Sequence, residues 1–224
     1  MTRPSRHAVL GDGPACVHLI ARFNNGEYFL SDPELKSTLR SLLLKFNREH
    51  LVRIHHYCFM DSHIHIIAST DSTDALSKFM HAVFFRLAQR INKRNHRKGH
   101  VFLDRPRTPV IQSGRRLLTT MRYLDLNPVR AQMVKKAHHY SWSSYRHYAY
   151  GEPDELIDDS PDYLGLSKVA ALRRRQYREL VNAVSGEGNQ RLPELSVWTY
   201  IGDLDWVRMM LRAGGFIRKP RPPG

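Results

Sequence analysis

The sequence predicts an α+β protein whose core is a ferredoxin-like, split βαβ sheet. Two observations favour this class. Short apolar segments typical of strands alternate with longer segments in which apolar residues recur at helical spacing. Through Lys136 their order is strand, helix, strand, strand, helix, strand, helix, and the first six elements match the split βαβ pattern. We therefore expect a four-stranded antiparallel sheet with its helices on one face, followed by a helical C-terminal extension.

The first half of this pattern begins with a strand over residues 15–23, where both alternating series of side chains are largely apolar. Ser31-Asp32-Pro33-Glu34 predicts a helix start, because a capping residue is followed by proline at the first helical position. The core-facing side of this helix comprises Leu35, Leu39, Leu42, Leu43 and Phe46. Residues 51–60 and 63–69 are expected to form a hairpin around a tight turn at Asp61-Ser62.

The second half contains a long helix, a short strand and a further helix. The long helix is expected over residues 72–99, with one apolar and one cationic side. Residues 108–112 form the short strand, and the prolines near its start indicate an edge position, because proline cannot donate to the hydrogen-bond ladder. The further helix is expected over residues 113–128.

We expect one domain over residues 1–150 and a helical extension with a basic tail over residues 151–224. The composition changes after Gly151, where an acidic, proline-containing stretch begins. From that point the sequence predicts a loop over 152–162, a basic helix over 166–184, a loose segment over 185–193, a short helix over 203–213 and a flexible basic tail over 218–224.

The positive charge of the chain is concentrated in one segment. The formal net charge is +14, and the segment from Arg86 to Lys136 contains 14 basic residues but only two acids, Asp104 and Asp125. Such a block is typical of proteins that bind a polyanion, and the alternative is a solvated basic face without a ligand. The residues expected to bind the backbone phosphates of such a partner are Arg86, Arg90, Lys93, Arg94, Arg97, Lys98, Arg105 and Arg107.

Composition also limits where the protein works. No apolar run approaches the roughly 20 residues of a membrane span, and no apolar signal core follows the basic N-terminus. The two cysteines, Cys16 and Cys58, lie in apolar segments and are expected to be reduced packing residues. We therefore expect a cytoplasmic protein that makes no membrane contact.

Two short motifs carry candidate chemistry. Side chains two apart on a strand share a face, so His63 and His65 would project side by side and could hold one divalent metal ion. Tyr123 and Asn127 lie four apart on a predicted helix and also share a face. A metal bound by two imidazoles and a side-chain oxygen would polarise a phosphate, and a nearby tyrosine hydroxyl could attack it. The product would be a covalent phosphotyrosine bond and a free DNA 3′-hydroxyl.

Simpler interpretations of these motifs stay open at this point. With 13 histidines and ten tyrosines in the chain, the histidine pair could be ordinary core or surface residues and Tyr123 one tyrosine among many. Asn127-Pro128 could also cap a new helical turn.

The order of four motifs resembles the single-tyrosine HUH transposases, in particular the branch called REP-associated tyrosine transposases. The resemblance runs from about His18 to Tyr150, with a weaker similarity after it. The motifs are Tyr57-Cys-Phe-Met-Asp-Ser-His-Ile-His65, Gly99-His-Val-Phe-Leu-Asp-Arg105, Arg122-Tyr-Leu-Asp-Leu-Asn-Pro-Val-Arg-Ala131 and Tyr140-Ser-Trp-Ser-Ser-Tyr145.

This resemblance implies roles for individual residues. His63 and His65 match the family's HUH metal pair, Tyr123 its catalytic tyrosine, and Asn127 the position of a third polar metal ligand. The implied metal is Mg²⁺ or Mn²⁺, and the implied partner is single-stranded DNA with a hairpin, bound by a monomer or homodimer. The family usually has Pro-Asn before the first histidine, whereas this chain has Asp61-Ser62.

The sequence therefore predicts a metal-dependent endonuclease and strand transferase that forms a 5′-phosphotyrosine intermediate. The alternative is a nucleic-acid-binding protein of the same fold that does not cleave. An RNA-binding sheet ranks last, because such sheets stack bases on exposed aromatic residues and the candidate strand carries histidines and isoleucines.

Overall fold

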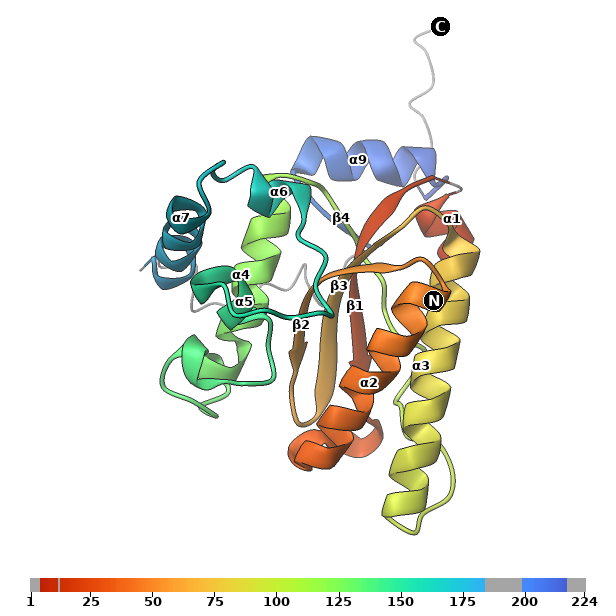
Figure 1. Ribbon diagram of the computed structural model, residues 1–224. Helices are drawn as coiled ribbons and strands as arrows, with labels where there is room; N and C mark the ends of the chain where they lie inside the picture. Colours follow the sequence, from red (N-terminus) through yellow and green to blue (C-terminus); the bar gives the residue numbers. More distant parts are fainter. Residues whose placement is uncertain (1–4, 12, 184–198, 217–224) are drawn as a thin grey trace, which may run out of the picture.

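The computed structural model describes residues 5–11, 13–183 and 199–216. In this part of the chain the centre of the protein is a sheet with the strand order β2-β3-β1-β4-β5 (Figure 1). The strands are β1 (Ala15–Arg22), β2 (Arg53–Phe59), β3 (His63–Thr70), β4 (Val110–Ile111) and β5 (Tyr200–Ile201).

The first four strands form the predicted antiparallel split βαβ sheet. Strand β1 pairs with β3 along its whole length, from Ala15 opposite Thr70 to Arg22 opposite His63. Strands β2 and β3 form the predicted hairpin, and β4 pairs with the other side of β1. The α+β, ferredoxin-like fold class is therefore confirmed.

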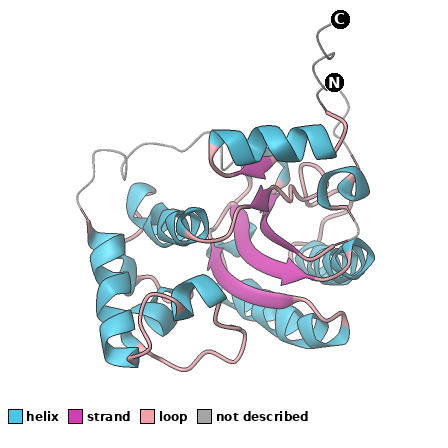
Figure 2. Ribbon diagram, turned by 90° about the horizontal axis from the view of Figure 1, so that it is seen from above, coloured by secondary structure: helices cyan, strands magenta, loops and turns pink. Residues whose placement is uncertain are grey.

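Two long helices, α2 (Pro33–Glu49) and α3 (Thr73–Arg94), cover one face of this sheet (Figure 2). Asp32 caps α2, accepting a hydrogen bond from the Glu34 backbone N–H at 2.8 Å, and Ser72 caps α3. Apolar side chains from every second position of the strands pack against these helices. The core formed in this way includes Val17, Leu19, Ile64, Ile66, Leu39, Leu43, Phe79 and Val83.

The opposite face is covered by α4 (Arg115–Arg130) and α5 (Tyr145–Tyr150), with α7 (Ala170–Asn182) outside them (Figure 2). The other alternate positions of the strands face this layer. Together with α4 they form a second apolar cluster. From the strands it includes Cys58, Ile67 and Ile111, and from α4 it includes Leu117, Met121 and Leu124. The prediction that the helices lie on one face therefore holds for α2 and α3, whereas the additional helices cover the other face.

Helix α4 continues through Asn127-Pro128 and ends at Arg130, so these residues do not cap a new turn. A proline inside a helix removes one intrahelical hydrogen bond. Because Pro128 lies two residues before the end of α4, only a short part of the helix follows this missing bond. Helix α3 ends earlier than predicted, at Arg94, and His96 has a positive φ of 48° that no longer fits a helix.

The prediction of an edge position for residues 108–112 is wrong. Strand β5 pairs in parallel with β4, with Tyr200 opposite Val110 and Ile201 opposite Ile111, and covers the side that was expected to be free. A strand of two residues is too short to show a periodic pattern, which is why the fifth strand was not predicted.

The extension contributes α6 (Pro161–Leu164), α7, β5 and α9 (Leu204–Ala213). Helix α7 is shorter than the predicted helix over 166–184, and α9 agrees closely with the one over 203–213. A short helix, α1 (Arg6–Leu10), precedes β1. The predicted loose segment over 185–193 and the tail over 218–224 fall outside the described residues, and the boundary at Gly151 stays a prediction. Among the described helices, none has the length and apolarity needed to cross a bilayer.

We expect the fifth strand to contribute substantially to stability. Ile201 is 3% exposed between the sheet and the α4 layer, so Ile201→Ala should lower the free energy of unfolding by about 2–4 kcal/mol. Urea unfolding followed by circular dichroism measures this change. Leu204→Ala is the control, because Leu204 is 64% exposed and its truncation should change stability by less than about 0.5 kcal/mol. Equal effects of the two substitutions would contradict the role given to β5.

Candidate active site

His63 and His65 lie on the face of the sheet that α4 covers. Side chains alternate along β3, and Ile67, two residues after His65, packs in the α4-side cluster. The intervening Ile64 and Ile66 pack in the core below α2 and α3. The two imidazole rings lie edge to face with their centroids 4.7 Å apart. The structure therefore brings the predicted histidine pair together.

Each of the two imidazoles is held through its Nδ1 atom. His63 Nδ1 is hydrogen-bonded to Ser62 Oγ at 3.0 Å, and His65 Nδ1 to His18 Nε2 at 2.9 Å. In the described structure no hydrogen bond occupies Nε2 of either ring. Metal-binding histidines show the same arrangement, with one ring nitrogen oriented by a neighbour and the other left for the ion.

Burial keeps this histidine pair neutral. It lowers the pKa of His63 to about 4, and Arg22 adds to the effect. Burial also lowers the pKa of His65 well below 6.5, and the neighbouring His63, His18, Arg22 and Arg130 lower it further. Neutral imidazole is the form that binds metal ions, so at pH 7 no proton needs to be displaced.

Tyr123 and Asn127 are joined on α4 by Arg130. The Arg130 guanidinium lies over the Tyr123 ring, 4.0 Å from its centroid. It donates a hydrogen bond to Asn127 Oδ1 at 2.9 Å and another to the Tyr123 backbone carbonyl. The predicted tyrosine and asparagine thus share one cationic surface of the helix.

The two predicted pairs are related through this arginine. The charge of Arg130 contributes to the lowered pKa of His65, so the Tyr123 side of α4 acts electrostatically on the histidine site. Among the described residues no hydrogen bond or ring contact links Tyr123 or Asn127 directly to His63 or His65. The structure brings together each pair, and both lie on the same side of the sheet.

The residues fit a divalent metal in part. The two imidazoles offer free Nε2 atoms, but the Asn127 carbonyl oxygen accepts from Arg130 and its buried Nδ2 has no partner. Within the described chain, no group of three or more His, Cys, Asp or Glu side chains is arranged to hold a metal ion. A metal ion held by the two histidines would need further ligands, which would be oxygen atoms from Asn127, water or a phosphate.

The turn that departs from the family pattern is held firmly. Lys36 of α2 is 5% exposed and its Nζ lies 2.6 Å from Asp61 Oδ1. The same ammonium lies over the rings of Tyr140 and Trp142, at 5.4 and 5.9 Å from their centroids. Asp61 therefore anchors the turn, and Ser62 orients His63 through its hydroxyl.

The predicted phosphate-binding residues fall into different environments. Arg86, Arg90 and Lys93 are exposed on α3 and line a groove between α2 and α3. Arg94 instead pairs with Asp32 and with Glu34, and Arg97 pairs with Glu27 at 2.9 Å. Arg105 and Arg107 follow α3 in the segment that runs beside β1, where the backbone of Arg107 is bonded to Ile20, and Lys98 is exposed.

Sequence reasoning missed several residues around the site. His18 is hydrogen-bonded to His65 from the adjacent strand, and Arg130 is hydrogen-bonded to Asn127. Asp125 of α4 is buried and hydrogen-bonded to His56 and Tyr177. Asp125 did leave a signal, because it is one of only two acids in the basic segment. The partners of these residues are distant in sequence, so their pairing was not visible.

Burial of His18 should make the protein less stable in acid. Burial, then the neighbouring His56 and His63, lowers the pKa of His18 to about 3 from its ordinary value of 6.5. Between pH 6.5 and 4.5 the unfolded chain takes up a proton at His18 and the folded chain does not, so stability falls by about 2 kcal/mol. Urea unfolding across this range should show that His18→Gln loses about this part of the pH dependence. An unchanged dependence would contradict the assignment.

Comparison with known proteins agrees with these features. Residues 15–112 match the family model described as "Transposase IS200 like". A solved structure of a REP-associated tyrosine transposase bound to a REP hairpin shares the fold, with a TM-score of 0.52 and 17% identity. The match covers 71% of this chain and 96% of that one. No curated protein is significantly similar in sequence. The family resemblance indicated by the motifs is therefore confirmed: through residues 15–112, the chain matches the IS200-like transposase family.

Proposed function

We propose that this protein is a transposase that cuts and rejoins single-stranded DNA at or near a hairpin, using a divalent metal ion and Tyr123. The match to a transposase family and the fold shared with a hairpin-bound relative support action on DNA hairpins. The observation that carries the finer proposal is the neutral His63–His65 pair. Its Nε2 atoms are free, and it lies on the face covered by the helix of Tyr123.

In the proposed reaction the Tyr123 oxygen attacks a backbone phosphorus atom. The bond from phosphorus to the 3′-oxygen breaks, which leaves a 5′-phosphotyrosine bond. The proton lost by the tyrosine passes to the released 3′-oxygen through solvent, so that a free DNA 3′-hydroxyl results. Attack by the 3′-hydroxyl of another strand reverses the step and releases Tyr123. Arg130, whose guanidinium lies over the Tyr123 ring, supplies positive charge beside the developing negative charge on the phosphate.

His63 and His65 would hold Mg²⁺ or Mn²⁺, and Asn127 would contribute its oxygen after release from Arg130. The ion, when bound, supplies Lewis-acid polarisation of the scissile phosphate. His18 would then accept a hydrogen bond from Nδ1–H of His65, so that Nε2 of His65 presents a lone pair.

The exposed cations of α3 would bind the DNA backbone. Arg86, Arg90 and Lys93 line the α2–α3 groove, to which Lys45 adds a fourth cation from α2. Because Arg94 and Arg97 already pair with carboxylates, their charge is partly neutralised. We therefore assign the larger share of phosphate binding to the groove cations.

A second function is favoured by one specific observation. The Asn127 oxygen is bonded to Arg130, so only two of the three proposed metal ligands are free. A protein that keeps this arrangement would bind DNA hairpins without cleaving them.

The central prediction concerns the nucleophile. Wild-type protein incubated with Mn²⁺ and a labelled single strand carrying a hairpin should form a covalent adduct that survives denaturing electrophoresis. Tyr123→Phe should lower adduct formation at least about 1,000-fold, because the attacking oxygen is absent, while hairpin binding stays within about two-fold.

Tyr28→Phe is the matched control, since Tyr28 is 68% exposed and lies outside the proposed site. Chelation of the metal with EDTA should abolish the adduct of the wild-type protein. An adduct that persists in Tyr123→Phe would assign the nucleophile elsewhere. Tight hairpin binding without any adduct, in Mg²⁺ or Mn²⁺, would favour the non-cleaving function.

The groove cations should give DNA binding its salt dependence. Arg90→Gln should weaken hairpin binding several-fold at low salt and reduce the slope of log K against log[salt] by about 1, because one fewer counterion is released. Fluorescence anisotropy at a series of salt concentrations measures both quantities. Arg175→Gln removes the same charge from an exposed position on α7 and should leave the slope unchanged. Identical slopes for all three proteins would exclude Arg90 from the DNA contact.

A further inference from the structure

A buried carboxylate lies on the helix that carries Tyr123. Asp125 is 1% exposed, although it belongs to an otherwise basic segment. Burying a charged carboxylate costs several kcal/mol unless hydrogen bonds and opposite charge compensate. Asp125 therefore needs hydrogen-bond partners, and these partners show which elements of the fold it joins.

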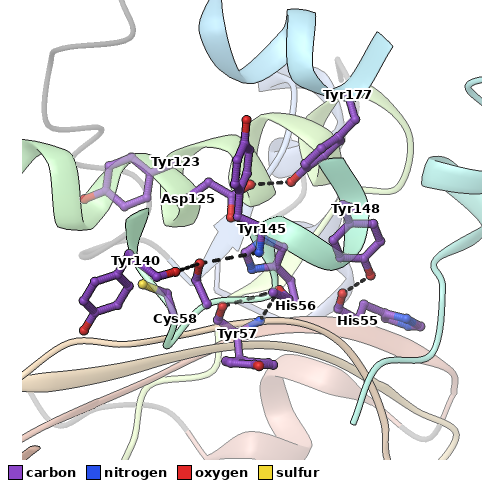
Figure 3. A network of polar contacts seen from close by, with 12 residues as sticks. His55, His56, Tyr57, Cys58, Tyr123, Asp125, Tyr140, Tyr145, Tyr148 and Tyr177 are labelled. Carbon is purple, nitrogen blue, oxygen red and sulfur yellow. Dashed lines mark hydrogen bonds and ion pairs between the residues drawn. The ribbon is translucent and has the colours of Figure 1, made fainter. Parts of the chain in front are cut away.

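Asp125 is bound by one group from the sheet and one from the C-terminal extension. His56 of β2 donates from Nε2 to Asp125 Oδ1 at 2.9 Å, and the Tyr177 hydroxyl of α7 donates to Oδ2 at 2.5 Å. Figure 3 shows Tyr177 and His56 reaching Asp125 from two different sides. We call these three residues the Asp125 clamp. It is the point at which α4 is fastened to both β2 and α7.

Aromatic rings surround the clamp and exclude water from it. The His56 ring stacks on Tyr148 with an interplanar angle of 3°, and Tyr148 lies against Tyr163 and Tyr177. Burial and the neighbouring Asp125 raise the pKa of Tyr177 well above 10, so its hydroxyl stays protonated and donates. In such surroundings the two hydrogen bonds are stronger than in water.

The clamp controls the rotation of α4 about its axis. Successive residues of a helix turn by about 100°, so Asp125 projects about 200° around the helix from Tyr123, on nearly the opposite side. Figure 3 shows the Tyr123 ring pointing away from the Asp125–Tyr177 pair. Asn127 and Arg130 lie on the Tyr123 side and contact one another. Holding Asp125 inward therefore fixes the direction in which Tyr123, Asn127 and Arg130 project from α4.

We propose that the extension after Gly151 is part of the active site. Through Tyr177 and the Asp125 clamp, it fastens α4 to the sheet and fixes the orientation in which α4 presents Tyr123. The effect on catalysis rests on the proposed function, whereas the effect on the orientation of Tyr123 does not. Tyr177, Asp125 and His56 are positioning residues in this scheme.

The first test removes one oxygen atom. Tyr177→Phe should slow formation of the covalent adduct about ten-fold or more at saturating DNA, because small misplacements of a reacting group cost large rate factors. Hairpin affinity should stay within about two-fold.

Tyr163→Phe is the matched control. The Tyr163 hydroxyl is buried in the same aromatic cluster and donates to the Tyr148 carbonyl at 2.9 Å, but it does not contact Asp125. Tyr163→Phe should lower the melting temperature about as much as Tyr177→Phe does and leave the rate of adduct formation unchanged. Equal rate losses in the two variants, or a normal rate in Tyr177→Phe, would overturn the proposal.

A conservative change at Asp125 should restore function where an apolar one does not. Asparagine can accept from Tyr177 through Oδ1 and donate from Nδ2 to the other tautomer of His56, whereas leucine can do neither. We expect Asp125→Asn to keep at least about a third of the wild-type adduct rate and Asp125→Leu to lose more than about ten-fold. Similar rates in the two variants would mean that the hydrogen bonds do not position α4.

One further measurement separates this proposal from the proposed function. With 3-fluorotyrosine at position 123, the fluorine spectrum should show one sharp line in the otherwise wild-type chain and a broadened or divided line in Tyr177→Phe. This readout needs neither DNA nor cleavage, and unchanged spectra would contradict the clamp.

Discussion

The burial of the Asp125 carboxylate is the constraint on which the arrangement of this protein depends. A buried carboxyl group must be hydrogen-bonded, and the partners of Asp125 come from a strand of the core and from a helix more than 50 residues later. The sheet, the tyrosine helix and the extension therefore meet at one residue. Apolar packing by Leu117, Met121 and Leu124 attaches α4 to the sheet, but apolar contacts alone permit sliding and rotation. The hydrogen-bonded carboxylate specifies one orientation.

The two faces of the sheet have different chemical roles. Below it, α2 and α3 enclose the larger apolar core and present Arg86, Arg90 and Lys93 to solvent. Above it lie the neutral histidines and α4, which carries Tyr123, Asn127 and Arg130. Alternation along β3 produces this division, since Ile64 and Ile66 enter the core while His63, His65 and Ile67 lie on the other face. Stability and proposed chemistry are thus encoded in the same eight-residue strand.

Desolvation prepares the histidine site before any ligand arrives. Burial lowers the pKa of His18, His63 and His65, and the charges of Arg22 and Arg130 lower the pKa of His65 further, so these imidazoles stay uncharged at pH 7. The turn before β3 completes this preparation, because Lys36 fastens Asp61 and leaves Ser62 to orient His63. The Asp61-Ser62 departure from the family pattern is therefore compatible with an ordered histidine pair.

The sequence by itself determined the elements whose patterns are local. The split βαβ order, the helix start at Ser31-Asp32-Pro33-Glu34, the His63–His65 alternation and the shared face of Tyr123 and Asn127 all follow from residue type and spacing. Only the tertiary structure decided which groups from distant segments meet: β5 beside β4, Lys36 on Asp61, His18 on His65, and Tyr177 on Asp125. The physical reason is that periodicity reports which side of an element is buried, whereas a buried polar group is satisfied by whichever partner the complete fold brings to it.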